Sequence, residues 1–366
     1  MKLECVREKI ADAVNKAEKI SSKNATLPIL KCVLLQAEKN SLVIRSTNLD
    51  IGIEIVIPAK VEIEGIVAIP GATLNSFLSH LSGEKGITIE LKEGNLYIST
   101  SKTSTTIKAY PPEDYPSLPR IDGGSVFEIP ADAFIRGLKS VWYSSATSSI
   151  KPELSSIRVY PDNDSLVFVA TDGFRLAEKK VKIKNVPTFS HVLIPVKNAT
   201  EIIRVFEGST EELSIAIDQN QLAISSENIY VVSRTVEGNF PDYKTIIPKE
   251  SSTEVTVLKQ DMTNILKLST IFSDSFHHIK FMVHPQGKEV EIITKNNDVG
   301  ENSSRIQAAV TGDSIDVNFN YRYISDSFQA IESDSLCFYF NGVAKPLVIR
   351  GVSDKTFMYL VMPMNR

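Results

Sequence analysis

The residue types that catalyse reactions or bind metals are scattered along this chain without the spacing that either task requires. The sequence contains no GxGxxG, GxxxxGKS, GxxxxGKT, HExxH or GxSxG pattern. Its histidines show no metal-ligand spacing with cysteines or carboxylates, so we expect no metal site. We therefore expect a binding or scaffolding protein without catalytic residues or a cofactor. The five histidines are His80, His191, His277, His278 and His284.

Three aspartates could suggest a carboxylate site, because they recur along the chain at nearly regular intervals. Asp50, Asp172 and Asp298 each follow a strand-like segment. Turns after strands are where Asp and Asn are expected, because their side chains accept hydrogen bonds from the backbone. We interpret these aspartates as turn residues in separate repeats, and the isolated pair His277-His278 as surface residues.

The cysteines indicate the compartment. Cys5, Cys32 and Cys337 are odd in number and too scattered for a disulfide framework. Free thiols are typical of a reducing compartment, so we expect a cytoplasmic protein. The polar, amphipathic start MKLECVREKI does not read as a secretory signal, and no apolar run approaches the roughly 18–20 residues of a membrane helix.

An internal repeat organises the chain. The stretch SLVFVATDGFRL (Ser165–Leu176) has a weaker copy at SLVIRSTNLD (Ser41–Asp50) and a fainter one at EVEIITKNND (Glu289–Asp298). Each copy begins 124 residues after the previous one. Such a period in a chain of 366 residues predicts three copies of one domain.

Each third shows the same order of helical and strand-like patterns. We expect an α+β fold of three domains, residues 1–120, 126–246 and 252–366, each with two helices and about eight strands. Pro111–Gly124 and Phe240–Ser252 are rich in proline and polar residues, so we interpret them as linkers. The expected apolar helix faces are Val6, Ile10, Ala13, Val14, Ala17 and Ile20; Leu74, Phe77, Leu78 and Leu81; Phe134, Leu138, Val141 and Trp142; Ile202, Ile203 and Phe206; Met262, Ile265, Leu266 and Phe272; and Tyr323, Ile324, Phe328 and Ile331.

The charge pattern allows nucleic-acid binding only on part of the surface. The chain carries 40 basic and 44 acidic residues, whereas compact nucleic-acid binders usually have a basic excess. Basic residues nevertheless recur opposite the apolar faces of the expected helices. On one helix this pattern is typical of a solvated face, but its recurrence favours a shared positive surface for phosphate backbone. The residues are Lys9, Lys16, Lys19, Lys23, Arg136, Lys139, Lys197 and Arg204.

We expect a partner-binding surface where the sequence of the middle repeat differs from that of the other two repeats. Its strand continues into Thr171–Leu176, and the chain ends in an apolar stretch that contains Met362-Pro363-Met364. Methionine side chains repack around different ligands, so they are common in peptide grooves. We expect Leu360 and Val361 to finish the last strand and the three residues after it to form a binding surface.

At these residues the sequence resembles the bacterial sliding clamps, the beta subunits of the replicative DNA polymerase III. The motifs are TLPIL (Thr26–Leu30), ATDGFRLA (Ala170–Ala177), NFPDY (Asn239–Tyr243) and VMPM (Val361–Met364), which together span all three repeats. The resemblance implies a non-enzymatic processivity factor that forms a ring as a head-to-tail homodimer. It also implies that the helices line the hole, where double-stranded DNA is bound without sequence specificity.

The resemblance further implies a hydrophobic cleft between the second and third domains. In the family this cleft binds short linear motifs of the polymerase III alpha subunit, the clamp loader, other DNA polymerases, ligase and mismatch-repair proteins. Phe174 stands where many members have histidine, which favours a more apolar peptide. Carried over by motif, the cleft consists of Leu154, Thr171, Gly173, Phe174, Arg175, Leu176, Pro241, Ile246, Asn320, Tyr323, Pro346, Val361, Met362, Pro363 and Met364.

For the dimer seam the resemblance implies Ile107 of one copy against Ile271 and Phe272 of the next, with Lys102 facing Asp298 or Glu301. For DNA it implies a contact at Lys197, whereas Lys23 lies beside a basic family position that Asn24 occupies here. An aromatic pair of the family is replaced by Pro152-Glu153. An alternative from another class stays open, a monomeric scaffold of three repeats that never closes on DNA.

Overall fold

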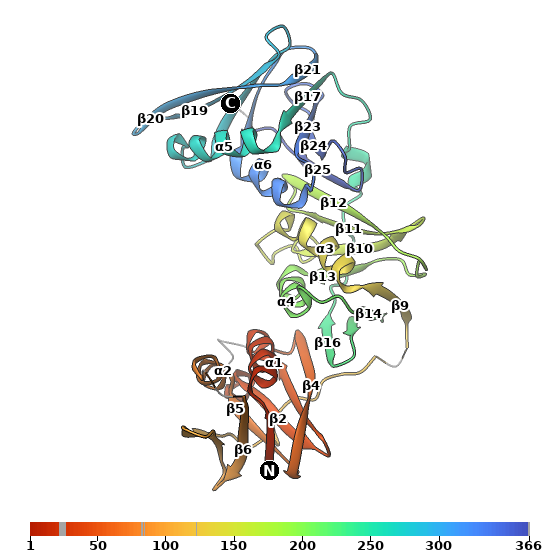
Figure 1. Ribbon diagram of the computed structural model, residues 1–366. Coiled ribbons are helices and arrows are strands. Elements are labelled where there is room, and N and C mark those ends of the chain that lie inside the picture. Colours follow the sequence, from red (N-terminus) through yellow and green to blue (C-terminus); the bar gives the residue numbers. More distant parts are fainter. Residues whose placement is uncertain (22–26, 82, 84, 122, 365–366) are drawn as a thin grey trace. The chain divides into compact units, whose positions relative to one another are not determined.

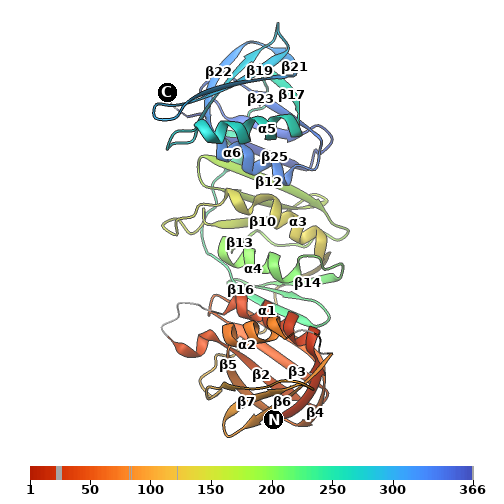
Figure 2. The same ribbon diagram turned by 60° about the vertical axis from the view of Figure 1, so that its left-hand side comes forward.

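The protein is described by a computed structural model that covers residues 1–21, 27–81, 83, 85–121 and 123–364. Within these residues, six α-helices and 25 strands form two compact units (Figures 1 and 2). The first unit comprises Met1–Asp132 and Lys197–Thr235, and the second comprises Ala133–Val196 and Val236–Arg366. The middle third of the sequence is therefore divided between the units.

The elements recur three times in the same order. The first repeat contains β1 (Lys2–Val6), α1 (Arg7–Ile20), β2 (Cys32–Glu38), β3 (Ser41–Thr47), β4 (Ile51–Ile63), β5 (Gly65–Pro70), α2 (Gly71–His80), β6 (Gly86–Lys92), β7 (Asn95–Ser99) and β8 (Ser104–Lys108). The second contains β9 (Ser125–Pro130), α3 (Ala131–Val141), β10 (Ser156–Asp162), β11 (Ser165–Thr171), β12 (Arg175–Lys182), β13 (Val192–Pro195), α4 (Val196–Phe206), β14 (Glu212–Ile217), β15 (Gln221–Ser225) and β16 (Ile229–Arg234). The third contains β17 (Thr253–Leu258), α5 (Lys259–Ser269), β18 (His278–His284), β19 (Glu289–Asn296), β20 (Gly300–Gln307), β21 (Ala309–Gly312), β22 (Ile315–Asn320), α6 (Tyr321–Ser327), β23 (Ser335–Phe340), β24 (Leu347–Gly351) and β25 (Phe357–Val361). Five short 3-10 helices complete the set: η1 (Pro28–Lys31), η2 (Trp142–Ser144), η3 (Tyr243–Ile246), η4 (Thr270–Phe272) and η5 (Phe328–Ala330).

This order confirms the expected α+β fold with two helices and about eight strands in each repeat. The three strands that revealed the period, β3, β11 and β19, have the same place in their repeats, because each pairs antiparallel with the strand before it and the strand after it. They begin at Ser41, Ser165 and Glu289, which preserves the spacing of 124 residues.

Strands of different repeats join in common sheets. In the first unit, a 12-stranded sheet has the order β8-β7-β6-β1-β4-β16-β15-β14-β9, and β3, β2 and β5 follow one another in a branch that starts at β4. In the second unit, a nine-stranded sheet has the order β13-β10-β11-β12-β25-β24-β23-β17-β21, and β20-β19-β18-β22 form a separate sheet. The pairs β4–β16 and β12–β25 each connect two repeats. The compact units therefore follow the sheets, while the boundaries 1–120, 126–246 and 252–366 stay a prediction.

The helices pack their apolar faces against these sheets. In α1, Ile10, Val14 and Ile20 are fully buried, and α2 lies beside α1 (Figure 1). In α3, Phe134 packs edge-on against Phe168 of β11, with ring centroids 5.6 Å apart. The interiors of both units are thus close-packed between helix and sheet, as burial of an apolar stripe requires.

Six residues expected on apolar helix faces lie outside the α-helices, of which Leu81, Phe328 and Ile331 are buried and Val6, Trp142 and Phe272 are not. Val6 ends β1 and is 47% exposed, because the chain starts with a strand in which Leu3 and Cys5 point inward. Trp142 begins η2 and is 37% exposed, and Phe272 ends η4 and is half-buried. All of them match the helical spacing, but Val6 precedes the first residue of α1 and the others follow the last residue of their helix.

The second expected linker is packed against the nine-stranded sheet. Phe240 and Tyr243 are buried in an apolar cluster with residues of β10, β11, β12 and β25. The segment has the composition of a loop, but its two aromatic side chains bury enough apolar surface to pack it against the sheet.

Candidate functional site

The loop after β11 is a tight turn that presents an aromatic side chain to solvent. The Thr171 hydroxyl donates to the carbonyl oxygen of Arg175 at 2.7 Å and accepts from the N–H of Gly173 at 3.1 Å. The Asp172 carboxylate accepts from the N–H groups of Phe174 and Arg175. Gly173 has φ of +92°, a conformation that residues with a Cβ rarely adopt. As a result the Phe174 side chain is 63% exposed.

The same turn occurs in the first repeat, and the shorter turn of the third repeat keeps its acceptor position, which corrects one expectation. Asn48 Oδ1 accepts from the N–H groups of residues 50 and 51, and Asn296 Oδ1 accepts from that of Asp298. The equivalent residues are therefore Asn48, Asp172 and Asn296, each 124 residues apart. Asp50 and Asp298 do lie in the turns, but they are not the positions equivalent to Asp172 in their repeats. Matching acidic residues misaligned the turns, whose shared feature is the oxygen that accepts the backbone bonds.

Arg175 ties this turn to helix α6. Its side chain is 11% exposed, and Nε donates to Asp172 Oδ2 at 2.9 Å while Nη1 donates to Asp326 Oδ2 at 2.6 Å. The guanidinium lies over the Tyr323 ring, 4.4 Å from its centroid. The Tyr359 hydroxyl donates to the carbonyl oxygen of Tyr323 at 2.7 Å. The guanidinium therefore holds the turn and α6 together.

Burial and charge act in opposite directions on these groups. Burial alone would lower the pKa of Arg175, but Tyr359, Asp326 and Asp172 raise that pKa above its usual value, so the guanidinium stays charged. Burial raises the pKa of the Tyr323 and Tyr359 hydroxyls, so both stay neutral near pH 7. This arrangement of one guanidinium, two carboxylates and two neutral tyrosine hydroxyls is better suited to stabilising the structure than to transferring protons.

The end of the chain lies beside the turn. Strand β25 pairs with β12 so that Val361 lies opposite Arg175. The N–H of Met362 donates to the carbonyl oxygen of Phe174, and the N–H of Met364 donates to that of Asn318, both at 2.8 Å. The segment after the last strand is thus hydrogen-bonded on one side to the turn and on the other to β22.

A hollow of about 380 Å³ opens beside this terminal segment. Sequence reasoning missed Val343 and Ala344, which line it in the turn between β23 and β24. Val343 is 61% exposed, and no local pattern predicts that its loop approaches the end of the chain. The lining residues are Asp316, Val317, Asn318, Val343, Ala344, Met362, Pro363 and Met364.

Several residues expected in the cleft are largely buried. Leu176 is 1% exposed, Val361 is fully buried, and Pro346 is buried directly before β24. Asn320 caps the N-terminus of α6, because its Oδ1 accepts from the N–H of Arg322 at 2.9 Å. These residues support the exposed side chains and offer little surface themselves.

Two further parts of the expected cleft lie on loops. Pro241 is exposed and Ile246 is 49% exposed on the segment that Tyr243 anchors in the core. Leu154 is half-buried in the loop after η2, where its backbone bonds stay local, to Ala146 at 2.8 Å and to Lys151 at 3.0 Å.

The basic residues expected to face DNA lie on α1, α3 and α4, except Lys23, which falls outside the described residues. Lys16 is half-buried and the other six are exposed. Acidic neighbours pair with some of them, as in Lys16–Asp12 at 2.9 Å and Arg204–Glu201 at 2.5 Å. The six helices together carry 11 basic and 7 acidic residues, a net charge of +4 that leaves −8 for the rest of the chain. The six exposed basic residues are Lys9, Lys19, Arg136, Lys139, Lys197 and Arg204.

The residues expected at the dimer seam lie on or beside β8, on η4, and on or beside β20. Strand β8 ends the 12-stranded sheet, and β20 ends the four-stranded one. On β8, Ile107 is only 5% exposed, and it lines a hollow with Phe77 of α2. Ile271 is 59% exposed, and the ring of Phe272 comes within 3.9 Å of the position that a Cβ on Gly300 would occupy. Lys102, Asp298 and Glu301 are all exposed.

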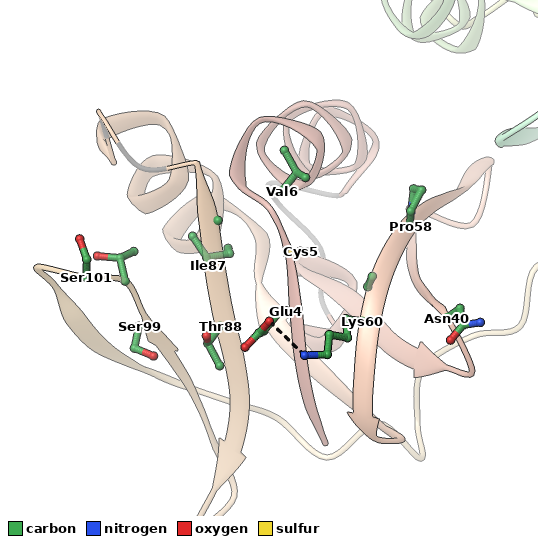
Figure 3. A pocket seen from close by; sticks show the side chains of 13 residues that line it. Glu4, Cys5, Val6, Asn40, Pro58, Lys60, Ile87, Thr88, Ser99 and Ser101 are labelled. Atoms are coloured by element: carbon green, nitrogen blue, oxygen red, sulfur yellow. Dashed lines mark ion pairs between the residues drawn. The ribbon is translucent and has the colours of Figure 1, made fainter.

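A larger hollow, of about 710 Å³, lies on the sheet of the first unit and carries no reactive constellation (Figure 3). Strand pairing places Ser99, Thr88, Glu4 and Lys60 in a row across four strands. The Glu4 carboxylate and the Lys60 ammonium are 3.8 Å apart and mostly exposed. They neutralise each other at a solvated sheet face.

The described part of the chain contains no group of three or more His, Cys, Asp and Glu side chains arranged to hold a metal ion. In the same part, no helix is both long and apolar enough to cross a bilayer. His278 Nδ1 lies 2.7 Å from Asp274 Oδ2, and the His277 ring contacts that of Tyr321 at 5.4 Å. The pair expected on the surface is therefore half-buried and structurally engaged.

Three models of one protein family match nearly the whole chain. The N-terminal domain of the DNA polymerase III beta subunit matches residues 1–119, the central domain matches 128–242, and the C-terminal domain matches 244–365. Curated relatives named beta sliding clamp include those of Synechococcus elongatus, 25% identical over 374 residues with 100% of this chain and 99% of the relative covered, and of Bacillus subtilis, 25% identical over 376 residues with both chains fully covered.

Solved structures show the same fold. The DNA polymerase III beta subunit of Thermotoga maritima superposes with a TM-score of 0.93 at 23% identity, over 100% of this chain and 99% of that one. A sliding clamp of Pseudomonas aeruginosa bound to griselimycin gives a TM-score of 0.94 at 21% identity, with both chains fully covered.

Proposed function

The chain belongs to the family of the DNA polymerase III beta subunit, the bacterial sliding clamps, and we propose from that premise how its surfaces serve the role. It is a non-catalytic processivity factor. We propose that two copies close head to tail into a ring around duplex DNA. Partner proteins then dock through short peptide motifs at the site formed by Phe174 and the end of the chain.

The unpaired sheet edges support ring closure. Within the chain, repeats join through β4–β16 and β12–β25, and by the 124-residue period β20 is the counterpart of β4 and β12 in the third repeat. Strand β8 is likewise the first-repeat counterpart of β16 and β25. Both β8 and β20 end their sheets, and an edge strand readily pairs with another chain. Pairing of β20 with β8 of a second copy, made twice, closes a two-fold ring and leaves no free edge of this kind.

This pairing brings the expected seam residues together. Ile107 lies on β8, and Phe272 lies beside Gly300 at the start of β20. Their apolar contact would flank the new strand pair, with Ile271 exposed nearby to extend it. Lys102 facing Asp298 or Glu301 would add a weak, salt-sensitive attraction.

The charge distribution supports loose binding of DNA. Helices with a net charge of +4 in a chain whose remainder carries −8 concentrate positive charge on one class of element. Several of these cations are paired with carboxylates on the same helix, which weakens their hold on any single phosphate. A screened attraction without base contacts suits a ring that must move along the duplex.

One observation supports the proposed peptide site. Phe174 is exposed on a turn that hydrogen bonds of Arg175 and Met362 hold in place. A rigid exposed aromatic side chain beside methionines is suited to an apolar peptide side chain. We propose that the DNA polymerase III alpha subunit and the clamp loader bind here, and with them other DNA polymerases, ligase and mismatch-repair proteins. We also propose the cytoplasm as the place of action, because replication proteins meet the chromosome there.

Loading onto circular DNA tests the ring. The chain, loaded by a clamp loader onto a nicked plasmid, should remain bound at high salt and dissociate once the plasmid is cut to a linear form. Loss at high salt from the intact circle would indicate ordinary electrostatic binding. Sedimentation should give twice 40.5 kDa, and a stable monomer at micromolar concentration would favour a scaffold that does not close.

Titration with a peptide that ends in the clamp-binding motif of a polymerase III alpha subunit tests the docking site. Phe174→Ala and removal of residues 362–366 should each weaken binding by roughly tenfold or more, as expected for a central aromatic contact. Val126→Ala removes an equally exposed apolar side chain, at 63%, from the first unit and should leave binding unchanged. Unchanged affinity in both cleft variants would exclude this site.

A further inference from the structure

Two glutamates 124 residues apart each bind the segment that follows their repeat. Glu54 on β4 accepts hydrogen bonds from Arg45 Nε at 2.6 Å and from Arg120, which belongs to the segment 111–124. Glu178 on β12 accepts a hydrogen bond from the Tyr243 hydroxyl of the segment 240–252. The position of the acceptor is the same in both repeats, but the donor has changed from an arginine to a tyrosine.

The second anchor is buried, whereas the first is half open to solvent. The side chain of Arg120 is 48% exposed. Tyr243, Glu178 and Tyr160 are 2%, 9% and 8% exposed, and the hydroxyl oxygens of the two tyrosines are 2.7 Å apart. Burial raises the pKa of Tyr243, and the adjacent Glu178 charge raises it further, so the hydroxyl keeps its proton. The hydroxyl is therefore a permanent donor to a carboxylate that water reaches poorly.

Aromatic and cationic contacts surround this anchor. The Phe240 and Tyr243 rings meet edge to face with centroids 6.4 Å apart. The Arg158 guanidinium lies 4.6 Å from the Tyr160 centroid, and the Lys244 ammonium lies 5.4 Å from it. Phe240 therefore restricts the Tyr243 ring directly, and the two cations restrict the Tyr160 ring, whose hydroxyl contacts that of Tyr243.

The position of Tyr243 fixes two residues of the proposed peptide site. The N–H of Tyr243 donates to the carbonyl oxygen of Pro241 at 2.9 Å, which closes a tight turn. Ile246 ends the single turn of 3-10 helix that Tyr243 begins. Any shift of the ring is thus passed to an exposed residue on each side of it.

We propose that the Glu178–Tyr243–Tyr160 network is a positioning device for the peptide site, which holds Pro241 and Ile246 where a bound peptide meets them. The proposal rests on the proposed docking function. It assigns to Glu178 and Tyr243 an effect on partner affinity, although neither offers surface to a peptide. The counterpart network at Glu54 has no such effect, because its segment carries no part of the docking site.

Removal of one hydroxyl tests the device. Tyr243→Phe keeps the ring but leaves the Glu178 carboxylate without its donor, and should weaken binding of the alpha-subunit peptide by about five- to tenfold, within the range of one net intramolecular hydrogen bond. Glu178→Gln retains an oxygen acceptor and should bind within about twofold of the wild-type chain. If Tyr243→Phe does not fold, Tyr160→Phe removes the second hydroxyl only and should weaken binding by about two- to threefold.

Tyr115→Phe is the matched control in the first linker. Its hydroxyl donates to the carbonyl oxygens of Cys32 at 3.0 Å and Arg45 at 3.3 Å, so the variant also loses buried bonds. It should lower the melting temperature as Tyr243→Phe does while leaving peptide affinity unchanged. Wild-type affinity in Tyr243→Phe, or an equal loss of affinity in Tyr115→Phe, would overturn the positioning role. Loss of affinity in Phe174→Ala alongside wild-type affinity in Tyr243→Phe would retain the docking site and reject only the device, whereas no binding by the wild-type chain would overturn both.

Discussion

Replacing Arg175 by methionine should destabilise the second unit by about 3 kcal/mol. Two hydrogen bonds between charged groups are lost, each of which contributes about 1.5–3 kcal/mol when buried. The cation–π contact with Tyr323 contributes about 0.5–1 kcal/mol more. Asp326 is 41% exposed and regains water, whereas Asp172 is 13% exposed and keeps only its bonds from the backbone. The sum is therefore reduced from its upper limit to about 3 kcal/mol.

The single tryptophan provides the assay. Trp142 lies in η2 of the second unit, so its fluorescence during urea unfolding reports on the unit that contains Arg175. With a denaturant slope of about 3 kcal/mol per molar, the unfolding midpoint should fall by about 1 M. The variant should also bind the alpha-subunit peptide more weakly, because the turn that carries Phe174 loses its link to α6.

Arg305 is the matched control, because it also faces two carboxylates. Its Nη1 lies 3.5 Å from Glu289 and its Nη2 lies 3.2 Å from Glu291, but its side chain is 60% exposed instead of 11%. Arg305→Met should cost less than about 1 kcal/mol, as exposed ion pairs usually do. If both variants cost the same, or if Arg175→Met costs less than about 1 kcal/mol, burial does not give the Arg175 network its strength and the reasoning is refuted.

Three further outcomes follow from the packing. Gly137→Ala should lower the free energy of urea unfolding by at least about 2 kcal/mol, because its Cβ would come within 2.4 Å of the fully buried Phe168 ring. A Cβ at Gly123 meets nothing within 4 Å, so Gly123→Ala should leave the unfolding free energy unchanged. Equal effects of the two variants would contradict this packing. Burial raises the pKa of Cys5 to about 12 and that of Cys32 to about 11. A disulfide reagent at pH 8 should therefore label at most the half-buried Cys337 quickly, and all three thiols only after unfolding. Rapid labelling of two thiols in the native chain would contradict the burial of Cys5 and Cys32. Burial alone would raise the pKa of Glu54, but Arg45 and Arg120 lower it, so its pairing stabilises the fold above about pH 4.3 and is lost as the pH falls through the depressed folded-state value. The roughly 1 kcal/mol by which Arg120→Gln lowers the unfolding free energy at pH 7 should therefore shrink toward pH 3, and a difference independent of pH would argue against the ion pair.

Local patterns predicted much of the fold. The alternation of apolar residues in β4, the continuous apolar run of β11 and the spacing of Ile10, Val14 and Ala17 in α1 match elements that the structure contains. Local spacing failed at Val6, which lies before the first residue of α1, and at Trp142, which lies after the last residue of α3, although both fit the apolar spacing. Helix ends are decided by contacts with neighbouring elements, which a periodicity does not contain.

Some residues of the proposed docking site stood out in the sequence, and others did not. Phe174 and Met362 stood out because the middle repeat and the end of the chain carry apolar residues where turns are usually polar. Asp326, Val343 and Tyr160 did not, because each looks ordinary in its own segment and acquires a role only through a neighbour far away in the sequence.

By itself the sequence determined the three repeats, their α+β type, the absence of the searched catalytic motifs and the turn that differs from its sisters. These properties depend on residues close together in the chain, or on one segment compared with its copies. The tertiary structure decided that sheets join across repeats, that Asn48, Asp172 and Asn296 are the equivalent turn residues, and that Glu178 anchors Tyr243. Pairing between distant strands sets which side chains meet, and a one-residue change of register would present a different set.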